Sequence, residues 1–211
     1  MDKVKTAVEK LKMLYPDAAC SLTSKTPLQL LISVRLSAQC TDLRVNLVTL
    51  ELFEKYKTAE DFANAGIVDV ENIIKPCGLF KTKARDIVMM CRELITRYNG
   101  IIPDTIEELL TLPGIGRKSA NLIVGDVYGK PAVVADTHFI RIMNRLGFVD
   151  TKDPFKVEIQ MKKLLDAAES NDFCHRTVLF GRDICKAKNP KCAECLLKNI
   201  CDYTKKSLKP A

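Results

Sequence analysis

Four cysteines near the C-terminus constrain the fold of this chain more than any other feature of its sequence. Their spacing is Cys185-x6-Cys192-x2-Cys195-x5-Cys201, so four thiols occur within 17 residues. Thiolates at this density can surround one compact soft-metal centre. Zinc sites prefer two pairs of closely spaced ligands, and in this segment only Cys192 and Cys195 form such a pair. The longer spacers suit a wider iron–sulfur cluster, so the spacing favours that cluster over zinc without deciding between them.

The other five of the nine cysteines stand singly in apolar segments, where cysteine behaves as a small buried hydrophobic residue. An odd number of cysteines without a secretory leader argues against a disulfide framework. The first twelve residues are charged throughout, and no apolar run approaches the roughly 18 residues of a membrane span. We therefore expect a soluble intracellular protein with no membrane partner.

Basic residues gather in the same C-terminal segment. The chain has a net charge of +7, and residues 182–211 hold eight Lys or Arg against three Asp or Glu. Three of these lysines, Lys186, Lys188 and Lys191, lie on the loop between the first two cysteines of the cluster. A loop fixed at both ends by metal ligands would hold them in place for phosphate contact, although a solvated loop is the simpler alternative.

Helical patterns cover nearly the whole chain, and we predict an all-α fold with about ten helices. The segment 131–135 alone resembles a strand, and it is short enough to be an extended connection. Helix starts are predicted by caps and first-turn prolines at Thr26-Pro27, at Thr58 with Asp61, and at Asp153-Pro154. Helix ends are predicted at Asn99-Gly100 and by C-terminal glycines at Gly147 and Gly181.

The motif Leu-Pro-Gly-Ile-Gly at residues 112–116 predicts a tight turn between two helices. The first helix begins after a cap at Asp104 or Thr105, and the second covers residues 117–128. The glycines Gly114 and Gly116 flank Ile115, so backbone N–H groups of this turn can approach an anion closely. The positive end of the following helix dipole adds to this attraction. The arrangement predicts a helix–hairpin–helix that binds phosphate without reading sequence.

Two residues beyond this turn have side chains suited to chemistry. Lys118 follows Arg117 at the positive end of a helix dipole, where the surroundings disfavour the charged amine and so favour a nucleophile. Another phosphate-binding lysine is an equally good interpretation of this position. Asp136 precedes a predicted helix, and it can act both as an N-cap and as a rigidly held carboxylate for acid–base work.

Three features together carry a family resemblance: LPGIGRKSA, the aspartate of VADTH eighteen residues after its lysine, and the C-x6-C-x2-C-x5-C cluster. The chain resembles the endonuclease III family of DNA glycosylases in the helix–hairpin–helix superfamily. The resemblance implies two closely packed helical domains that flank a DNA-binding groove. Residues 21–130 would form a six-helix barrel with the helix–hairpin–helix at about 105–128. Residues 1–20 and 131–211 would form an iron–sulfur domain with its cluster loop at 185–201.

The resemblance also implies an activity and roles for individual residues. It predicts a base excision repair enzyme that removes oxidised pyrimidines from duplex DNA and cleaves the strand 3′ to the abasic site by β-elimination. Lys118 would be the nucleophile that forms a Schiff base, and Asp136 its catalytic partner. Gln39 would fill the gap left by the extruded base, and Leu79 would wedge into the opposite strand.

The implied cofactor is a [4Fe–4S] cluster on Cys185, Cys192, Cys195 and Cys201, which would hold the loop of Lys186, Lys188 and Lys191 against DNA. The implied partner is double-stranded DNA with damaged bases or abasic sites, bound by a monomer. The location would be cytoplasmic, on the nucleoid in a bacterium. Two alternatives remain: a non-enzymatic helix–hairpin–helix protein that senses redox state through its cluster, and a monofunctional adenine-type glycosylase.

Overall fold

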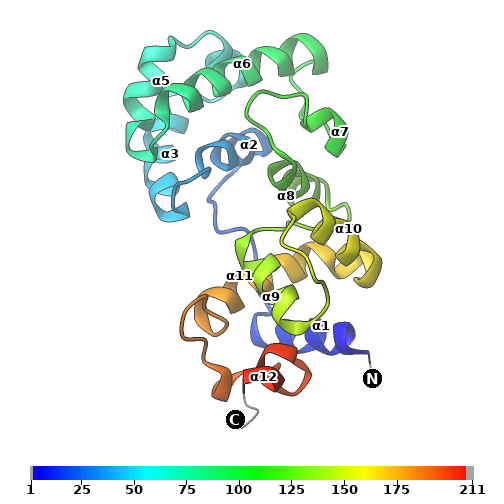
Figure 1. The fold of residues 1–211 in the computed structure, drawn as a ribbon. Helices are drawn as coiled ribbons and strands as arrows, with labels where there is room; N and C mark the ends of the chain where they lie inside the picture. The colour runs from blue at the N-terminus through cyan, green and yellow to red at the C-terminus, as the bar shows by residue number, and fades with distance from the viewer. Residues whose placement is uncertain (1, 208–211) are drawn as a thin grey trace. The chain divides into compact units, whose positions relative to one another are not determined.

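The computed structural model describes residues 2–207, and every regular element in that range is helical (Figure 1). Twelve α-helices and four 3₁₀ helices occur there, which confirms the predicted all-α fold. The expected number of about ten was too low, since three of the α-helices span six residues or fewer. No helix of the described part is long and apolar enough to cross a membrane.

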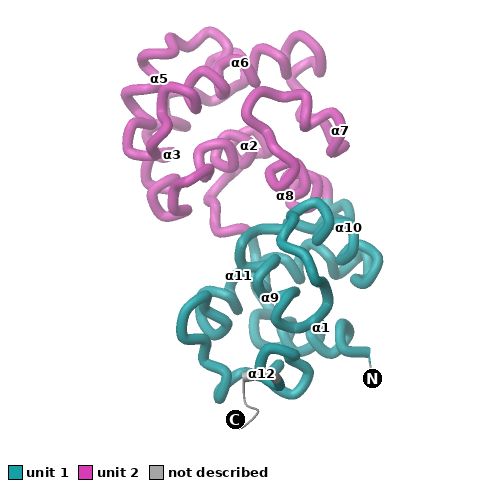
Figure 2. The backbone as a smooth tube through the Cα atoms, in the orientation of Figure 1, with its two compact units in different colours: residues 1–19, 129–211 teal, residues 20–128 magenta. Residues whose placement is uncertain are grey.

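The chain divides into two compact units, shown in Figure 2. Unit 1 contains both ends of the chain, residues Met1–Ala19 and Gly129–Ala211, and unit 2 contains the middle, Cys20–Tyr128. The elements of unit 2 are α2 (Pro27–Leu36), α3 (Asp42–Lys55), α4 (Ala59–Ala63), α5 (Ile67–Ile74), η1 (Lys75–Cys77), α6 (Phe80–Tyr98), α7 (Ile106–Leu109) and α8 (Arg117–Tyr128). Those of unit 1 are α1 (Lys3–Leu14), α9 (Thr137–Leu146), α10 (Pro154–Leu164), η2 (Ala167–Glu169), α11 (Ser170–Asp183), η3 (Cys192–Glu194), η4 (Lys198–Ile200) and α12 (Asp202–Ser207).

Side-chain caps start the helices where the sequence predicts them. The Thr26 hydroxyl accepts a hydrogen bond from the Gln29 N–H, and Pro27 takes up the first turn of α2. Thr58 and Asp61 form a reciprocal capping box at α4. Each cap satisfies amides that the first helical turn leaves without an internal partner, which contributes about 1 kcal/mol per helix.

Unit 2 is built around α6, its longest helix. This helix packs against α2, α4 and α5. Its inward face carries Ala84, Ile87, Val88, Cys91 and Leu94, all 0% exposed. They join one apolar core that also includes Leu112 and Ile115 of the turn before α8, so the core reaches the hairpin directly.

Unit 1 packs α9 and α1 against α11, and α12 against α9. The segment 129–136, where the chain re-enters unit 1, has no strand, so residues 131–135 are an extended connection as predicted. The backbone N–H of Ala132 donates to the Ser170 hydroxyl and that of Val134 to the Cys174 sulfur, both at 3.2 Å. These bonds to α11 satisfy buried amides that have no sheet partner, and they fix the approach to Asp136.

The prediction that Gly181 ends a helix is wrong. Helix α11 continues through Gly181 to Asp183, and Gly181 is buried. A Cβ at this position would lie 2.5 Å from Nδ1 of His138 on α9. The glycine therefore permits close approach of two helices, a long-range reason that a local C-cap pattern cannot reveal. Gly147, by contrast, ends α9 with a left-handed φ of 77°, as predicted.

Candidate functional site

The turn before α8 is anchored by its apolar side chains. Leu112 and Ile115 are 2% and 6% exposed, and the Ile115 N–H donates to the Leu112 carbonyl at 3.2 Å. Gly114 and Gly116 are exposed. The Ile115 N–H is thus already hydrogen-bonded within the turn, so a phosphate would approach the backbone at the two exposed glycines. The buried Ile115 side chain anchors the turn to the core.

A largely buried ion pair supports this turn. The Arg35 guanidinium of α2 bonds one carboxylate oxygen of Asp86 on α6, from Nε at 3.0 Å and from a terminal nitrogen at 2.7 Å. Gly114 lies against this pair with a φ of +75°, and a Cβ there would lie 2.3 Å from Nε of Arg35. The first glycine of the motif is therefore required both by its backbone conformation and by the ion pair beneath it.

Lys118 lies in the first turn of α8, immediately after the hairpin. Its side chain is exposed, whereas that of Arg117 is half-buried. The fully buried Asn121 donates to the Arg117 carbonyl at 3.1 Å, which fixes this first turn from inside. The amine of Lys118 is thus carried by a rigid helix start and is accessible to a substrate.

Asp136 is the N-cap of α9 and is half-buried. Its carboxylate accepts the Phe139 N–H at 2.7 Å, so its orientation is fixed by the helix that it caps. Nearby, burial lowers the pKa of His138, an effect that the Asp136 carboxylate opposes. The Nδ1 atom of that imidazole lies 3.1 Å from a terminal nitrogen of Arg141, a geometry suited to an unprotonated Nδ1 accepting from the guanidinium.

Gln39 and Leu79 share an unusual backbone conformation. Both are exposed and both lie in the left-handed region, with φ values of 54° and 50°. Leu79 is 56% exposed, so its large apolar side chain is in contact with solvent on a left-handed turn. Strained backbone is concentrated at functional sites, and nothing in the local sequence predicts it here.

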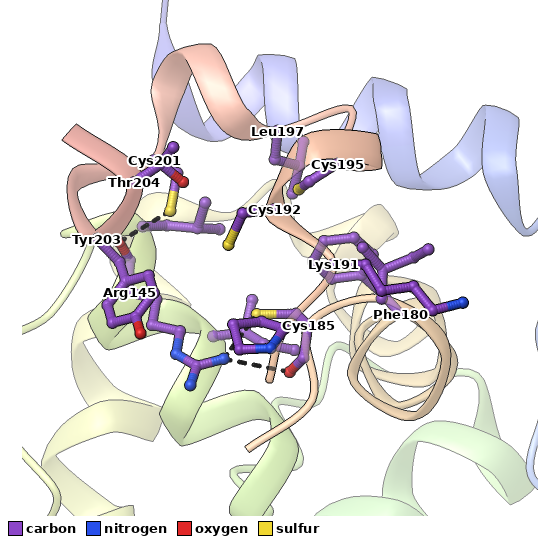
Figure 3. Close-up of a pocket in the computed structure, with 14 residues that line it drawn as sticks. Arg145, Phe180, Cys185, Lys191, Cys192, Cys195, Leu197, Cys201, Tyr203 and Thr204 are labelled. Carbon is purple, nitrogen blue, oxygen red and sulfur yellow. Dashed lines mark hydrogen bonds between the residues drawn. The ribbon is translucent and has the colours of Figure 1, made fainter. Parts of the chain in front are cut away.

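The four cysteines of the C-terminal cluster line a single pocket in unit 1. Figure 3 shows the sulfur atoms of Cys185, Cys192, Cys195 and Cys201 on its walls. All four are free thiols, and the rest of the wall is mostly apolar, with Phe180 and Leu197 among its members. Four soft sulfur donors around one pocket fit an iron–sulfur cluster, whose ligands are thiolates.

Arg145 of α9 supports this pocket, and sequence reasoning did not identify it. Its guanidinium donates to the Cys185 sulfur at 3.3 Å and to the carbonyls of Lys186 at 2.7 Å and Ala187 at 3.0 Å. It also stacks over the Tyr203 ring at 4.7 Å. An N–H donor to a ligand sulfur both orients the ligand and stabilises its thiolate form. The hydrogen bonds of the Arg145 guanidinium join positions 40 to 42 residues apart in the sequence, so no local pattern reveals them.

The loop from Lys186 to Lys191, called the basic loop below, projects from this pocket. Lys186, Lys188 and Lys191 are all exposed. The Lys191 N–H donates to the Ile184 carbonyl at 3.0 Å and closes the base of the loop, while Asn189 turns it with a left-handed φ of 50°. The three ammonium groups are therefore displayed on a closed loop rather than on a free tail.

Comparison with known proteins identifies the family. The pattern of the HhH-GPD superfamily of base excision DNA repair proteins matches residues 32–167, and that of the iron–sulfur binding domain of endonuclease III matches residues 185–201. The chain is 42% identical to endonuclease III of Synechocystis over 90% of its own length and 88% of the relative's. The chain belongs to the endonuclease III family. Endonuclease III of Escherichia coli K12 is 36% identical over 93% of both chains.

Solved structures agree with this membership of the endonuclease III family. A non-covalent endonuclease III–DNA complex superposes with a TM-score of 0.92 at 41% identity, over 98% of this chain and 97% of the other. A thermostable thymine-DNA glycosylase at 24% identity, with a TM-score of 0.87, shares the fold. The chain is therefore a DNA glycosylase and AP lyase of base excision repair that carries an iron–sulfur cluster. Neither the non-enzymatic alternative nor the adenine-type alternative is favoured.

Proposed function

We propose that this enzyme removes oxidised pyrimidines from duplex DNA and then cleaves the strand, with Lys118 as the nucleophile of both steps. The observation that carries the proposal is the exposed amine of Lys118 at the start of α8, directly after the turn of residues 112–116. The first turn of α8 must be rigid, because a nucleophile reacts fastest when its orientation toward the reacting atom is fixed. The buried Asn121 and Ile115 on either side supply that rigidity.

The chemistry balances with one amine. The Lys118 nitrogen attacks C1′ of the sugar, and the glycosidic bond breaks with its electron pair leaving on the base, which takes up a proton. The nitrogen then loses one proton, and the C1′–O4′ bond of the sugar ring breaks as O4′ takes up a proton, which gives a cationic Schiff base. That cation acidifies the C2′ proton, and its removal expels the 3′ phosphate by β-elimination. Water then hydrolyses the Schiff base and regenerates the amine.

Asp136 is proposed to serve the charged stages of this sequence. Its carboxylate is fixed by the Phe139 N–H at 2.7 Å and keeps further lone pairs for a second partner. A fixed anion stabilises positive charge that develops on the sugar, and it can accept and return the protons that move. Capping and catalysis are compatible because they use different lone pairs of the same group.

Duplex DNA is the proposed partner because a damaged base must leave the stack before the amine can reach C1′. Gln39 and Leu79 are suited to replace it: both are exposed on strained turns, one with an amide that can pair with a base edge and one with an apolar wedge. Gly114, Gly116 and the helix start at Arg117 would hold the phosphate backbone, as would the basic loop.

The cluster is proposed to be of the [4Fe–4S] type and structural. Four thiols line one pocket, and only Cys192 and Cys195 form the closely spaced pair that zinc sites favour. This spacing favours a wider polynuclear centre over zinc. When bound, the cluster supplies four metal–sulfur bonds that join Cys185 to Cys201 and so fix the basic loop between its first two ligands.

Schiff-base trapping tests the proposed function. The holoprotein is incubated with a duplex that contains one thymine glycol and is reduced with borohydride, beside Lys118→Ala. We expect a covalent protein–DNA band for the wild type and none for the variant. Base release without a trapped band would replace the lysine mechanism by direct attack of water. Absence of both, on lesion and abasic duplexes alike, would overturn the proposal.

A further inference from the structure

Lys83 of α6 is a lysine with no exposure to solvent. It is 0% exposed and is among the largest fully buried side chains of the described residues. Lysine is almost never fully buried unless its ammonium group is paired. Burial lowers the pKa of Lys83, the direction expected for a cation removed from water. Removing an ammonium group from water is unfavourable, and a leucine or methionine would pack here without that cost. The lysine therefore calls for an explanation beyond packing.

The two partners of Lys83 are backbone carbonyls from two segments that are far from each other in the sequence. Its Nζ donates to the carbonyl of Leu36, the last residue of α2, at 2.8 Å, and to that of Cys77, the last residue of η1, at 2.9 Å. Carbonyls at helix C-termini carry partial negative charge and lack intrahelical donors, so a cation is the natural group to satisfy them. One ammonium group thus joins the ends of two segments that are 41 residues apart in sequence.

Each of these carbonyls lies just before one of the two strained, exposed residues described above. Gln39 follows Leu36 by three residues, and Leu79 follows Cys77 by two. Left-handed backbone is strained for residues other than glycine, so neither turn keeps this conformation unless its surroundings fix it. The Lys83 ammonium fixes the residue at which each turn begins.

We propose that Lys83 is a positioning residue that keeps the two DNA-inserting turns, at Gln39 and Leu79, at a fixed separation from one another. The inference rests on the proposed roles of those two residues. Lys83 does not touch the reacting atoms, because its amine is buried and bonded to carbonyls. A base extruded from a duplex must be replaced on one strand and its partner strand wedged apart in the same event. Two turns tied to one cation keep their separation during that event, whereas two independent turns would not.

The first test compares Lys83→Met, which keeps length and apolar volume but has no donor, with Lys57→Met. Lys57 is an exposed lysine of the same unit, so this control removes the same charge. We expect Lys83→Met to lower single-turnover base release from a thymine glycol duplex on the order of 10²-fold, as small misplacements of positioning groups do. Cleavage of an abasic site in single-stranded DNA, where there is no opposite strand to wedge, should stay within about twofold of the control.

A double-mutant cycle separates positioning from a general structural role. In a Gln39→Ala, Leu79→Ala background the turns have nothing to insert, so adding Lys83→Met should cost less than about threefold further. The same large loss in both backgrounds would overturn the inference, as would duplex activity of Lys83→Met equal to that of Lys57→Met. If Lys83→Met does not fold, Lys83→Arg, which keeps a cationic donor of different shape, enters the same cycle with an expected loss of about tenfold.

The wild-type protein distinguishes failure of this inference from failure of the proposed function. A wild type that neither releases the oxidised base nor cleaves an abasic duplex contradicts the proposed function, and with it the premise for Lys83. A fully active wild type whose Lys83→Met variant behaves like Lys57→Met contradicts the positioning role alone.

Discussion

The hairpin turn of unit 2 and the cluster loop of unit 1 (residues 185–201) are both proposed to contact DNA phosphates, yet different interactions hold them in place. The hairpin turn buries Leu112 and Ile115 in a continuous apolar core and rests on an ion pair. The cluster loop has only Leu197 and Cys201 buried, and its regular structure consists of two 3₁₀ helices of three residues each. The hairpin is therefore held by the core of unit 2, whereas few buried side chains hold the cluster loop, and we expect that loop to depend on its metal.

Removing one cluster ligand should have the largest effect on this comparison. Cys195→Ala should lose the visible absorption of the cluster and the protease resistance of residues 185–201, at a cost of several kcal/mol to unit 1. Cys91→Ala is the matched control, because Cys91 is a buried cysteine of unit 2 and the four cluster cysteines belong to unit 1. Hydrogen exchange should find the hairpin amides unchanged in both. Retention of iron and of loop protection by Cys195→Ala would contradict the contrast.

The hairpin turn should instead be destabilised by adding a single methyl group at Gly114. Gly114→Ala forces a Cβ into the Arg35–Asp86 pair and keeps a left-handed φ, so we expect a loss of about 2–4 kcal/mol in the free energy of unfolding. Gly100→Ala is the control: its φ is +76°, but nothing lies within 4 Å of a Cβ there, which leaves a cost of about 1 kcal/mol. Equal losses in the free energy of unfolding for the two variants, measured in urea, would show that the ion pair moves aside without a cost.

A smaller effect is expected from the guanidinium that supports the cluster loop. Arg145→Met removes the donor to the Cys185 sulfur and to two loop carbonyls, and outer-shell changes of this kind cost roughly 10–100-fold in metal affinity. Competition with a chelator, followed through the cluster absorption, measures this loss. The exposed Arg85 on α6 provides the control variant Arg85→Met. Identical iron release from the two variants would assign Arg145 no part in holding the loop.

The smallest effect concerns the lysines that the cluster loop displays. Lys188→Ala should reduce the slope of log binding constant against log salt concentration by about 1, because each phosphate contact releases close to one counterion. Affinity should fall several-fold for lesion and undamaged duplexes alike. Lys57→Ala, an exposed lysine of unit 2, should leave the slope unchanged. An unchanged slope for Lys188→Ala would make the basic loop a solvated surface.

Local patterns in the sequence predicted much of the fold and few of the supports of the site. Caps such as Thr26 and Thr58, and the turn at 112–116, are determined by residues within four positions, so sequence reading finds them. Gly181, Lys83 and the Arg35–Asp86 pair depend on contacts between segments 40 or more residues apart, and no local pattern encodes them. The left-handed turns at Gln39 and Leu79 were missed for a different reason, since neither residue type favours that conformation.

Mapping of the trapped adduct is the most direct test of Lys118 as the nucleophile. The borohydride-reduced complex is digested, and the peptide that carries the sugar remnant is sequenced by mass spectrometry. The account predicts the remnant on Lys118, in a peptide that trypsin cuts after Arg117 but not after the modified lysine. A remnant on any other amine, such as Lys130 or the N-terminus, would contradict it.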